Sequence, residues 1–279
     1  MSRRLHSTEL SCTTSESMSN IVKTEAVVLK SMKYRESSKI MTFLTPQFGK
    51  ISAFVKGARN LKSKYGSSLE PMSYVLIVVY HKDGREIQTV SQCDLMKSFR
   101  NLYEHIDKMA AGMEMIELVA IVSHEQEANV SLFSLLVNSL TTLNDATKNP
   151  RNVLYKFGIE LAGILGFRPG FGGCVACGAT VMEGIGTPGT IEYHLGKGGP
   201  LCLAHHLTPG PKVSLFSGVF WSLRQFASSR NIVGVLDIGL DENSRCEIEA
   251  FILSFLRYHV SGMRRLKSEK VFAKILSTP

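Results

Sequence analysis

The first part of the chain alternates between short runs rich in β-branched and aromatic residues and stretches that favour turns. These runs cover residues 21–30, 39–45, 50–56, 74–81 and 86–93, and Asp83-Gly84 between the last two is typical of a hairpin. No helical period separates them. Five strands in so short a stretch predict a small closed barrel, because closure removes exposed sheet edges. The five-stranded OB-fold is the leading candidate at this size.

From about residue 99 the apolar spacing changes to three and four, which is typical of helices. The first such stretch contains Met109, Met113, Ile116 and Ala120. Similar spacing follows at residues 132–143, 154–165, 216–228 and 246–266. Residues 171–208 are rich in glycine and have no long apolar period, so they are interpreted as an insertion between helices of one bundle.

These patterns predict an α+β multidomain protein. We expect a barrel that binds nucleic acid at residues 21–98 and a helical domain in two parts, residues 99–170 and 209–279, with a metal-binding segment at 171–208 between them. Residues 1–20 are rich in serine and threonine and have no apolar stretch typical of a signal peptide. They are interpreted as a disordered tail, or as the result of a start codon placed ahead of Met18. No apolar run approaches the roughly 20 residues of a membrane span.

Two short motifs in the inserted segment predict a metal site. Cys174 and Cys177 enclose two residues, as do Cys202 and His205. This spacing is typical of a tetrahedral zinc ion held by three thiolates and one imidazole. All four positions are filled, so the site is expected to be structural rather than catalytic. His206 and His194 are alternative fourth ligands.

The other three cysteines, Cys12, Cys93 and Cys246, are scattered along the chain. They do not suggest a disulfide framework, and a reducing compartment is therefore expected.

Charge predicts an anionic partner. The chain has 32 Lys and Arg against 24 Asp and Glu, a formal net charge of +8. No acidic residue occurs between Ser37 and Leu69. The loops after the first strand and between the fourth and fifth strands are also basic, and OB-folds bind oligonucleotides with these loops. The candidate nucleic-acid-binding residues are Lys33, Arg35, Lys39, Lys50, Phe54, Lys56, Arg59, Lys62, Lys64, Lys82 and Arg85.

Alternation along the strands suggests a stacking surface among these cations. Lys50, Ser52, Phe54 and Lys56 share one face of the third strand. Residues 39, 41, 43 and 45, which include Phe43, share one face of the second. A ring beside phosphate-binding cations is a usual platform for single strands. The alternative is that these rings belong to the barrel core.

An ordered set of motifs resembles the RecO family of recombination mediators. It begins with the segments at residues 23–30 and 34–39, and the stretch from Phe48 to Arg59 is the most recognisable. The similarity continues through residues 165–169, Cys174 with Cys177, residues 198–202, Tyr258-His259 and residues 266–268. The second metal motif departs from the family, which often has cysteine where this chain has His205.

The resemblance implies an N-terminal OB-fold, a helical domain and a zinc-binding segment. It also implies binding of single- and double-stranded DNA, annealing of complementary strands, and help in loading recombinase onto strands coated by single-strand-binding protein. The implied partners are RecR and the C-terminal tail of single-strand-binding protein. The implied location is the bacterial cytoplasm, in association with the nucleoid.

Two other functional classes remain open. In the first, the protein is a scaffold with little DNA contact, and the basic run Arg264, Arg265 and Lys267 binds the acidic tail of a partner. Alternatively, these cations only interact favourably with the dipole at the C-terminus of a helix. In the second, it is an enzyme, for example with Cys174 and Cys177 as a redox pair. The sequence lacks a βαβ pattern around those cysteines, a Gly-rich phosphate loop and a nucleophile–base pair, so no catalytic activity is expected.

Overall fold

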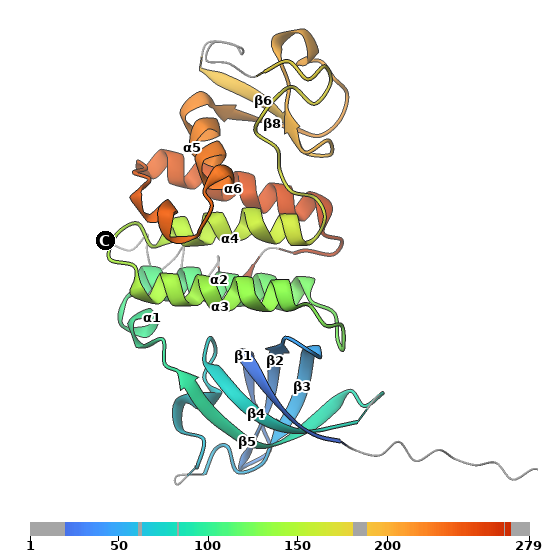
Figure 1. Ribbon diagram of the computed structural model, residues 1–279, viewed down its shortest axis with the longest axis vertical. Coiled ribbons are helices and arrows are strands. Elements are labelled where there is room, and N and C mark those ends of the chain that lie inside the picture. The colour runs from blue at the N-terminus through green and yellow to red at the C-terminus, as the bar shows by residue number, and fades with distance from the viewer. Residues whose placement is uncertain (1–19, 61–62, 83, 181–188, 265, 269–279) are drawn as a thin grey trace, which may run out of the picture.

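The computed structural model describes residues 20–60, 63–82, 84–180, 189–264 and 266–268. Of the predicted tail, residues 1–20, only Asn20 is among the described residues. Lys62 and Arg265 lie outside them. Figure 1 shows a barrel at one end of the molecule, layers of helices in the middle and a small sheet at the other end. The three parts are stacked along the longest axis.

The N-terminal part is a closed barrel of β1 (Asn20–Tyr34), β2 (Ser38–Thr45), β3 (Gly49–Val55), β4 (Tyr74–His81) and β5 (Ile87–Lys97), in the order β1-β2-β3-β5-β4. Only β3 and β5 pair in parallel; the other neighbours are antiparallel. The five predicted strands are confirmed. A short 3-10 helix, η1 (Gly66–Leu69), lies between β3 and β4.

The long strand β1 belongs to both halves of the barrel. Its first half pairs with β4 and its second half with β2, and a bulge interrupts the register between Val28 and Lys30. A bulge of this kind bends the strand and increases its twist, which a small closed barrel requires. β1 extends four residues beyond its predicted end, so Lys33 is a strand residue and not a loop residue.

Within the described residues six helices follow the barrel: α1 (Arg100–Glu104), α2 (Ile106–Val122), α3 (Val130–Asp145), α4 (Arg151–Ile164), α5 (Ser217–Ser228) and α6 (Glu242–His259). The last was predicted at residues 246–266. It begins earlier because the Asp241 carboxylate caps it, accepting from the Ser244 amide at 2.7 Å, and it ends at His259. A 3-10 helix, η3 (Val233–Asp237), joins α5 to α6.

A second, small sheet lies at the far end of the molecule and was not predicted. Its strands are β6 (Thr190–His194), β7 (Gly199–Pro200) and β8 (Lys212–Phe216), in the order β7-β6-β8. Tyr193 on β6 is buried against Phe251 of α6, with ring centroids 4.9 Å apart. The sheet is therefore anchored to the helical core through an aromatic contact.

The loop between α2 and α3 joins the barrel to the helices; we call this contact the seam. The Lys50 amide donates to the His124 carbonyl at 3.4 Å, and the Gln126 amide donates to the Lys50 carbonyl at 3.2 Å. The Lys50 ammonium also donates to the Ala120 carbonyl in the last turn of α2, at 3.1 Å. Gly49 has φ +59, and a Cβ there would lie 1.9 Å from the Glu127 carbonyl oxygen.

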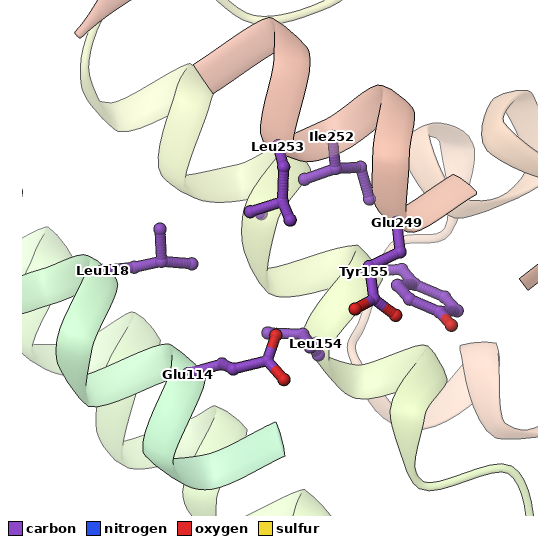
Figure 2. A pocket seen from close by; sticks show the side chains of 8 residues that line it. Glu114, Leu118, Leu154, Tyr155, Glu249, Ile252 and Leu253 are labelled. Atoms are coloured by element: carbon purple, nitrogen blue, oxygen red, sulfur yellow. The ribbon is translucent and has the colours of Figure 1, made fainter. Parts of the chain in front are cut away.

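Three ionised side chains connect α2, α4 and α6. The Arg151 guanidinium lies 3.6 Å from the Glu114 carboxylate and 3.4 Å from that of Glu249. Only 2% of the Glu114 side chain is exposed. Figure 2 shows Glu114 and Glu249 at a small cavity, otherwise lined largely by apolar side chains. Burial opposes the charge on Arg151, but the two carboxylates raise its pKa, so Arg151 stays charged and joins the three helices through ion pairs.

The seam predicts a specific sensitivity at Gly49. Gly49→Ala should lower the free energy of unfolding by about 3 kcal/mol or more, because the new methyl group would collide with the Glu127 carbonyl. Gly66→Ala is the matched control: it also has positive φ, but no atom within 4 Å of the added Cβ, so a loss of about 1–2 kcal/mol is expected. Chemical denaturation measures both, and equal losses would contradict a tightly packed seam.

Candidate nucleic-acid interface and metal site

The outer face of β3 carries an aromatic ring. Along this strand Ile51, Ala53 and Val55 are buried inside the barrel, while Lys50, Ser52 and Phe54 lie on the other side and are partly exposed. The predicted shared face of these outer residues is confirmed. Phe54 is thus not part of the barrel core.

Tyr34, at the end of β1, completes the aromatic surface. Its ring lies edge-on to that of Phe54, with centroids 5.5 Å apart and planes at 90°. The Arg35 guanidinium carbon lies 5.4 Å from the Tyr34 ring centroid. Tyr34 is not among the predicted candidate residues, because its contact with Phe54 crosses the sheet and leaves no local signal in the sequence. The only available signal was its position beside the basic turn.

On β2 the predicted platform is wrong. Met41, Phe43 and Thr45 are all buried inside the barrel, so Phe43 offers no surface for stacking. Lys39 is engaged as well, because its ammonium lies 3.3 Å from the Glu70 carboxylate. Of the aromatic residues on the first three strands that were considered for stacking, only Phe54 lies on the outer face of the barrel.

Three exposed cations lie close to this aromatic surface, in the β1–β2 turn and just after β3: Arg35, Lys56 and Arg59. Lys33 is exposed as well, but it pairs with Lys39 and so lies on the other side of the sheet from Tyr34 and Phe54. Two hydrogen bonds hold this arrangement. The Arg59 guanidinium donates to the Arg35 carbonyl at 2.6 Å, and the Arg59 amide donates to the Ser37 carbonyl at 3.0 Å. The loop after β3 is therefore fixed to the β1–β2 turn, although the two are more than twenty residues apart in sequence.

The remaining predicted cations lie elsewhere. Lys82 and Arg85 are exposed in the β4–β5 loop. This loop ends at β5, whose first residue, Ile87, pairs with Ser52 of β3. The loop is therefore close to the start of β3, whereas the β1–β2 turn is close to its end. Lys50 is occupied in the seam. The Lys64 ammonium donates to the Ser91 carbonyl at 2.8 Å and lies 5.2 Å from the Tyr65 ring centroid. The structure therefore brings together only part of the predicted set.

The four predicted metal ligands converge. Ligand atoms of Cys174, Cys177, Cys202 and His205 all lie within 4.8 Å of one another. Cys177 Sγ is 3.8 Å from Cys202 Sγ, and His205 Nδ1 is 3.2 Å from Cys202 Sγ and 3.9 Å from Cys174 Sγ. Metal–sulfur and metal–nitrogen bonds of tetrahedral sites imply edges of about 3.5–3.8 Å. These residues could hold a metal ion.

The local backbone explains this convergence. Gly178 adopts φ +75, and its amide donates to the Cys174 carbonyl at 2.8 Å, which turns the chain back after Cys177. Leu203–His205 forms a 3-10 turn, η2, that brings His205 to Cys202. Burial raises the pKa of the Cys174 thiol, but backbone hydrogen bonds from Cys202, Ala176 and Cys177 oppose it and lower the pKa to about 6. A thiolate, the form that binds metals, is favoured there.

The structure distinguishes His205 from the two alternative ligands. His194 is buried with both ring nitrogens engaged: Nδ1 accepts from the Lys197 amide at 3.1 Å, and Nε2 lies 2.9 Å from the Pro209 carbonyl. His206 is exposed, with Nδ1 2.5 Å from the Leu203 carbonyl. Of the three histidines, His205 is the one placed among the cysteines.

Comparison with known proteins agrees with the motifs. Residues 18–99 match the family model for the N-terminal part of recombination protein O, and residues 103–270 match the model for its C-terminal part. The chain belongs to the RecO family. A DNA repair protein RecO from Salinibacter ruber is 33% identical over 259 residues, which is 92% of this chain and 95% of that protein.

A second relative, a DNA repair protein RecO from Chloroherpeton thalassium, is 29% identical over 263 residues. The match covers 92% of this chain and 99% of that protein. The similarity thus extends over the barrel, the helices and the metal segment of this RecO-family chain. Within the part of the chain that the structure describes, no helix is both long and apolar enough to cross a membrane.

Replacing the histidine ligand should abolish metal binding. His205→Ala leaves three thiols, and the affinity for the ion should fall more than about 100-fold, since even residues that only support ligands contribute 10–100-fold. His206→Ala should bind metal as the unaltered chain does. Elemental analysis of the purified variants gives the identity and amount of metal. Loss of metal from His206→Ala alone would refute the assignment of His205.

Proposed function

We propose that the protein is a DNA repair and recombination mediator that binds single- and double-stranded DNA through its barrel. In this proposal it acts in the bacterial cytoplasm at the nucleoid and by binding, not by catalysis. It anneals complementary strands and helps to load recombinase onto DNA coated by single-strand-binding protein. The observation that carries the proposal is the Tyr34–Phe54 aromatic pair on the outer face of the barrel, with the exposed cations Arg35, Lys56 and Arg59 in the adjoining turn and loop.

The topology supports an OB-fold for the barrel. The order β1-β2-β3-β5-β4, with β3 and β5 parallel, is that of a five-stranded barrel whose β1–β2 and β4–β5 loops flank the β2–β3 face. In this chain the first loop carries Arg35 and the second carries Lys82 and Arg85. Cations therefore stand at both ends of the face that holds Phe54.

Annealing follows from the chemistry of this surface. Exposed lysine and arginine side chains neutralise phosphates on two strands and so reduce the repulsion that opposes their pairing. Stacking on the rings holds bases without regard to their identity, because every base has a π-face. Little sequence preference is expected, since neither kind of contact reads base edges.

We further propose that the metal ion is zinc and that it is structural. Three thiolates and one imidazole are a usual zinc donor set, and all four positions are protein ligands. The buried apolar cluster around the site contains only Cys174, Leu201 and Cys202, with Val175 packed against it. So small a core supports little stability without the ion, and metal binding and local folding would be coupled.

The test is annealing of complementary strands that are coated with single-strand-binding protein. The protein should accelerate annealing, and the double variant Arg35→Gln/Lys56→Gln should lose most of this effect. The slope of log affinity against log salt for single strands should fall in magnitude by about 1.4 for two lost phosphate contacts. Measuring DNA binding between low and physiological salt gives this slope.

The control removes the same charge elsewhere. Lys197 and Arg230 are exposed outside the barrel, and Lys197→Gln/Arg230→Gln should keep the slope and the annealing rate. If both double variants behave alike, the barrel is not the DNA site. If the unaltered protein does not accelerate annealing although it is folded, the mediator proposal fails.

A second candidate function is recruitment of proteins, through RecR and the acidic tail of single-strand-binding protein. The Glu117 carboxylate accepts from the Lys267 amide at 2.8 Å and from the Ser268 amide at 2.9 Å. Burial opposes ionisation of Glu117, but these bonds and that from the Ser268 hydroxyl lower its pKa. The segment is fixed to α2 through its backbone, while the side chains of Arg264 and Lys267 are exposed.

Charge reversal tests this recruitment surface. If Arg264 and Lys267 bind the tail, Arg264→Glu/Lys267→Glu should weaken binding of a tail peptide by about tenfold or more, since hydrogen bonds between charged groups contribute about 1.5–3 kcal/mol each. Calorimetric titration measures this affinity, and Lys197→Glu/Arg230→Glu serves as the control. Unchanged peptide binding in the first variant would remove this surface from consideration.

A further inference from the structure

The strand register places six outward-facing residues in one continuous row around the barrel. Thr89 of β5 pairs with Phe54 of β3 on one side and with Tyr80 of β4 on the other. The row continues from Phe54 to Ile40 and Met32, and from Tyr80 to Ile21. We call these six residues the outer belt: Ile21, Tyr80, Thr89, Phe54, Ile40 and Met32.

The belt faces away from the barrel interior and is exposed. The residues next to it along three of the strands, Val55, Val79 and Val90, are buried inside the barrel. On the belt itself, 66% of Ile21, 46% of Met32 and 40% of Tyr80 are exposed. Isolated exposed apolar residues are ordinary. A row with no charged member, on the basic domain of a protein of net charge +8, needs a different explanation.

Cations border the belt on both sides. The neighbouring row on the side of the β1–β2 turn contains Lys23, which pairs with Val78. Lys56 continues this row directly after the last residue of β3, two positions beyond Phe54. Lys30 and Lys82 lie in the neighbouring row on the opposite side, where Lys30 pairs with Thr42. Among the described residues, neither of these two rows contains an aspartate or a glutamate. An apolar strip between two cationic borders is complementary to a single strand, whose bases and phosphates lie side by side.

We propose that a single strand crosses the barrel along the outer belt, and that Tyr80 is a second stacking residue. This proposal rests on the proposed DNA-binding function and extends it beyond Tyr34 and Phe54 to the β4 side of the barrel. Tyr80 and Phe54 are two strand spacings apart, about 10 Å, so each ring can hold a different base. Phosphates then lie along the lysines of either border.

The track is tested at Tyr80. Tyr80→Ala should weaken binding of a labelled oligo(dT) about 5- to 100-fold, the range expected for one lost stack. The salt slope should stay unchanged, because no phosphate contact is removed. Tyr80→Phe keeps the ring and should bind as the unaltered protein does. Leu95→Ala is the matched control, since Leu95 on β5 is also 40% exposed but lies outside the belt.

A fluorescent reporter provides an independent measurement. The chain has one tryptophan, so Trp221→Phe gives a background without tryptophan. In that background oligo(dT) should quench the fluorescence of Tyr80→Trp but not that of Leu95→Trp. If oligo(dT) binds Tyr80→Ala normally and leaves Tyr80→Trp unquenched, the track is wrong while DNA binding by the barrel stands. If the unaltered protein binds no oligo(dT), the proposed function fails together with the track.

If Tyr80→Ala instead lost binding to RecR and kept its affinity for oligo(dT), the belt would be a protein-binding surface. That result would also overturn the proposal.

Discussion

The parallel pairing of β3 with β5 closes the barrel, and the remaining structural features of this domain depend on it. Closure gives every strand two neighbours, so successive side chains along a strand point alternately into the core and out to the surface. Val55 and Val90 fill the interior on these two strands, and Phe54 and Thr89 are thereby placed outside. Because β5 pairs with β3 on one side and with β4 on the other, this pairing also fixes which residues of β3 and β4 lie in the same row. The outer surface is therefore ordered by register, and residues distant in sequence form continuous rows.

The other parts of the molecule are connected in different ways. The helical bundle has a large apolar core that extends from Val27 and Leu44 of the barrel to Tyr193 of the small sheet. Inside it, Arg151 joins three helices through ion pairs. The apolar cluster beside the four candidate ligands is small, with Cys174, Leu201 and Cys202 buried and Val175 packed against them, and Gly178 turns the chain back after Cys177. Apolar burial is thus extensive in the barrel and the bundle and slight around the four residues that could hold a metal ion.

Much of the fold was predictable because its signals are local. Alternation and the Asp83-Gly84 signal located the five strands, and apolar spacing located the main helices. The small sheet was missed because β6 and β8 have five residues each and β7 has two, which is too short for a period to emerge. The cluster of Cys174, Cys177, Cys202 and His205 could be predicted because two short motifs carry these residues. Contacts between distant segments could not be predicted, because no local pattern encodes them. Tyr34 contacts Phe54 across the sheet, and Lys39 and Lys50 have partners far away in the sequence. Alternation also did not tell which face of β2 is buried, and Phe43 points inward.

The seam also determines where the chain can be divided. The two family models meet near residue 100, which suggests a barrel and a helical domain that could be produced separately. In the structure, however, Val27, Leu29 and Leu44 on the barrel belong to the core of the helices, and the edge of β3 at Gly49 and Lys50 is covered by the α2–α3 loop. An excised barrel would expose both an apolar surface and an unpaired strand edge, which together promote aggregation. The boundary between the two matched regions is therefore a boundary in sequence, and apolar packing is continuous across it.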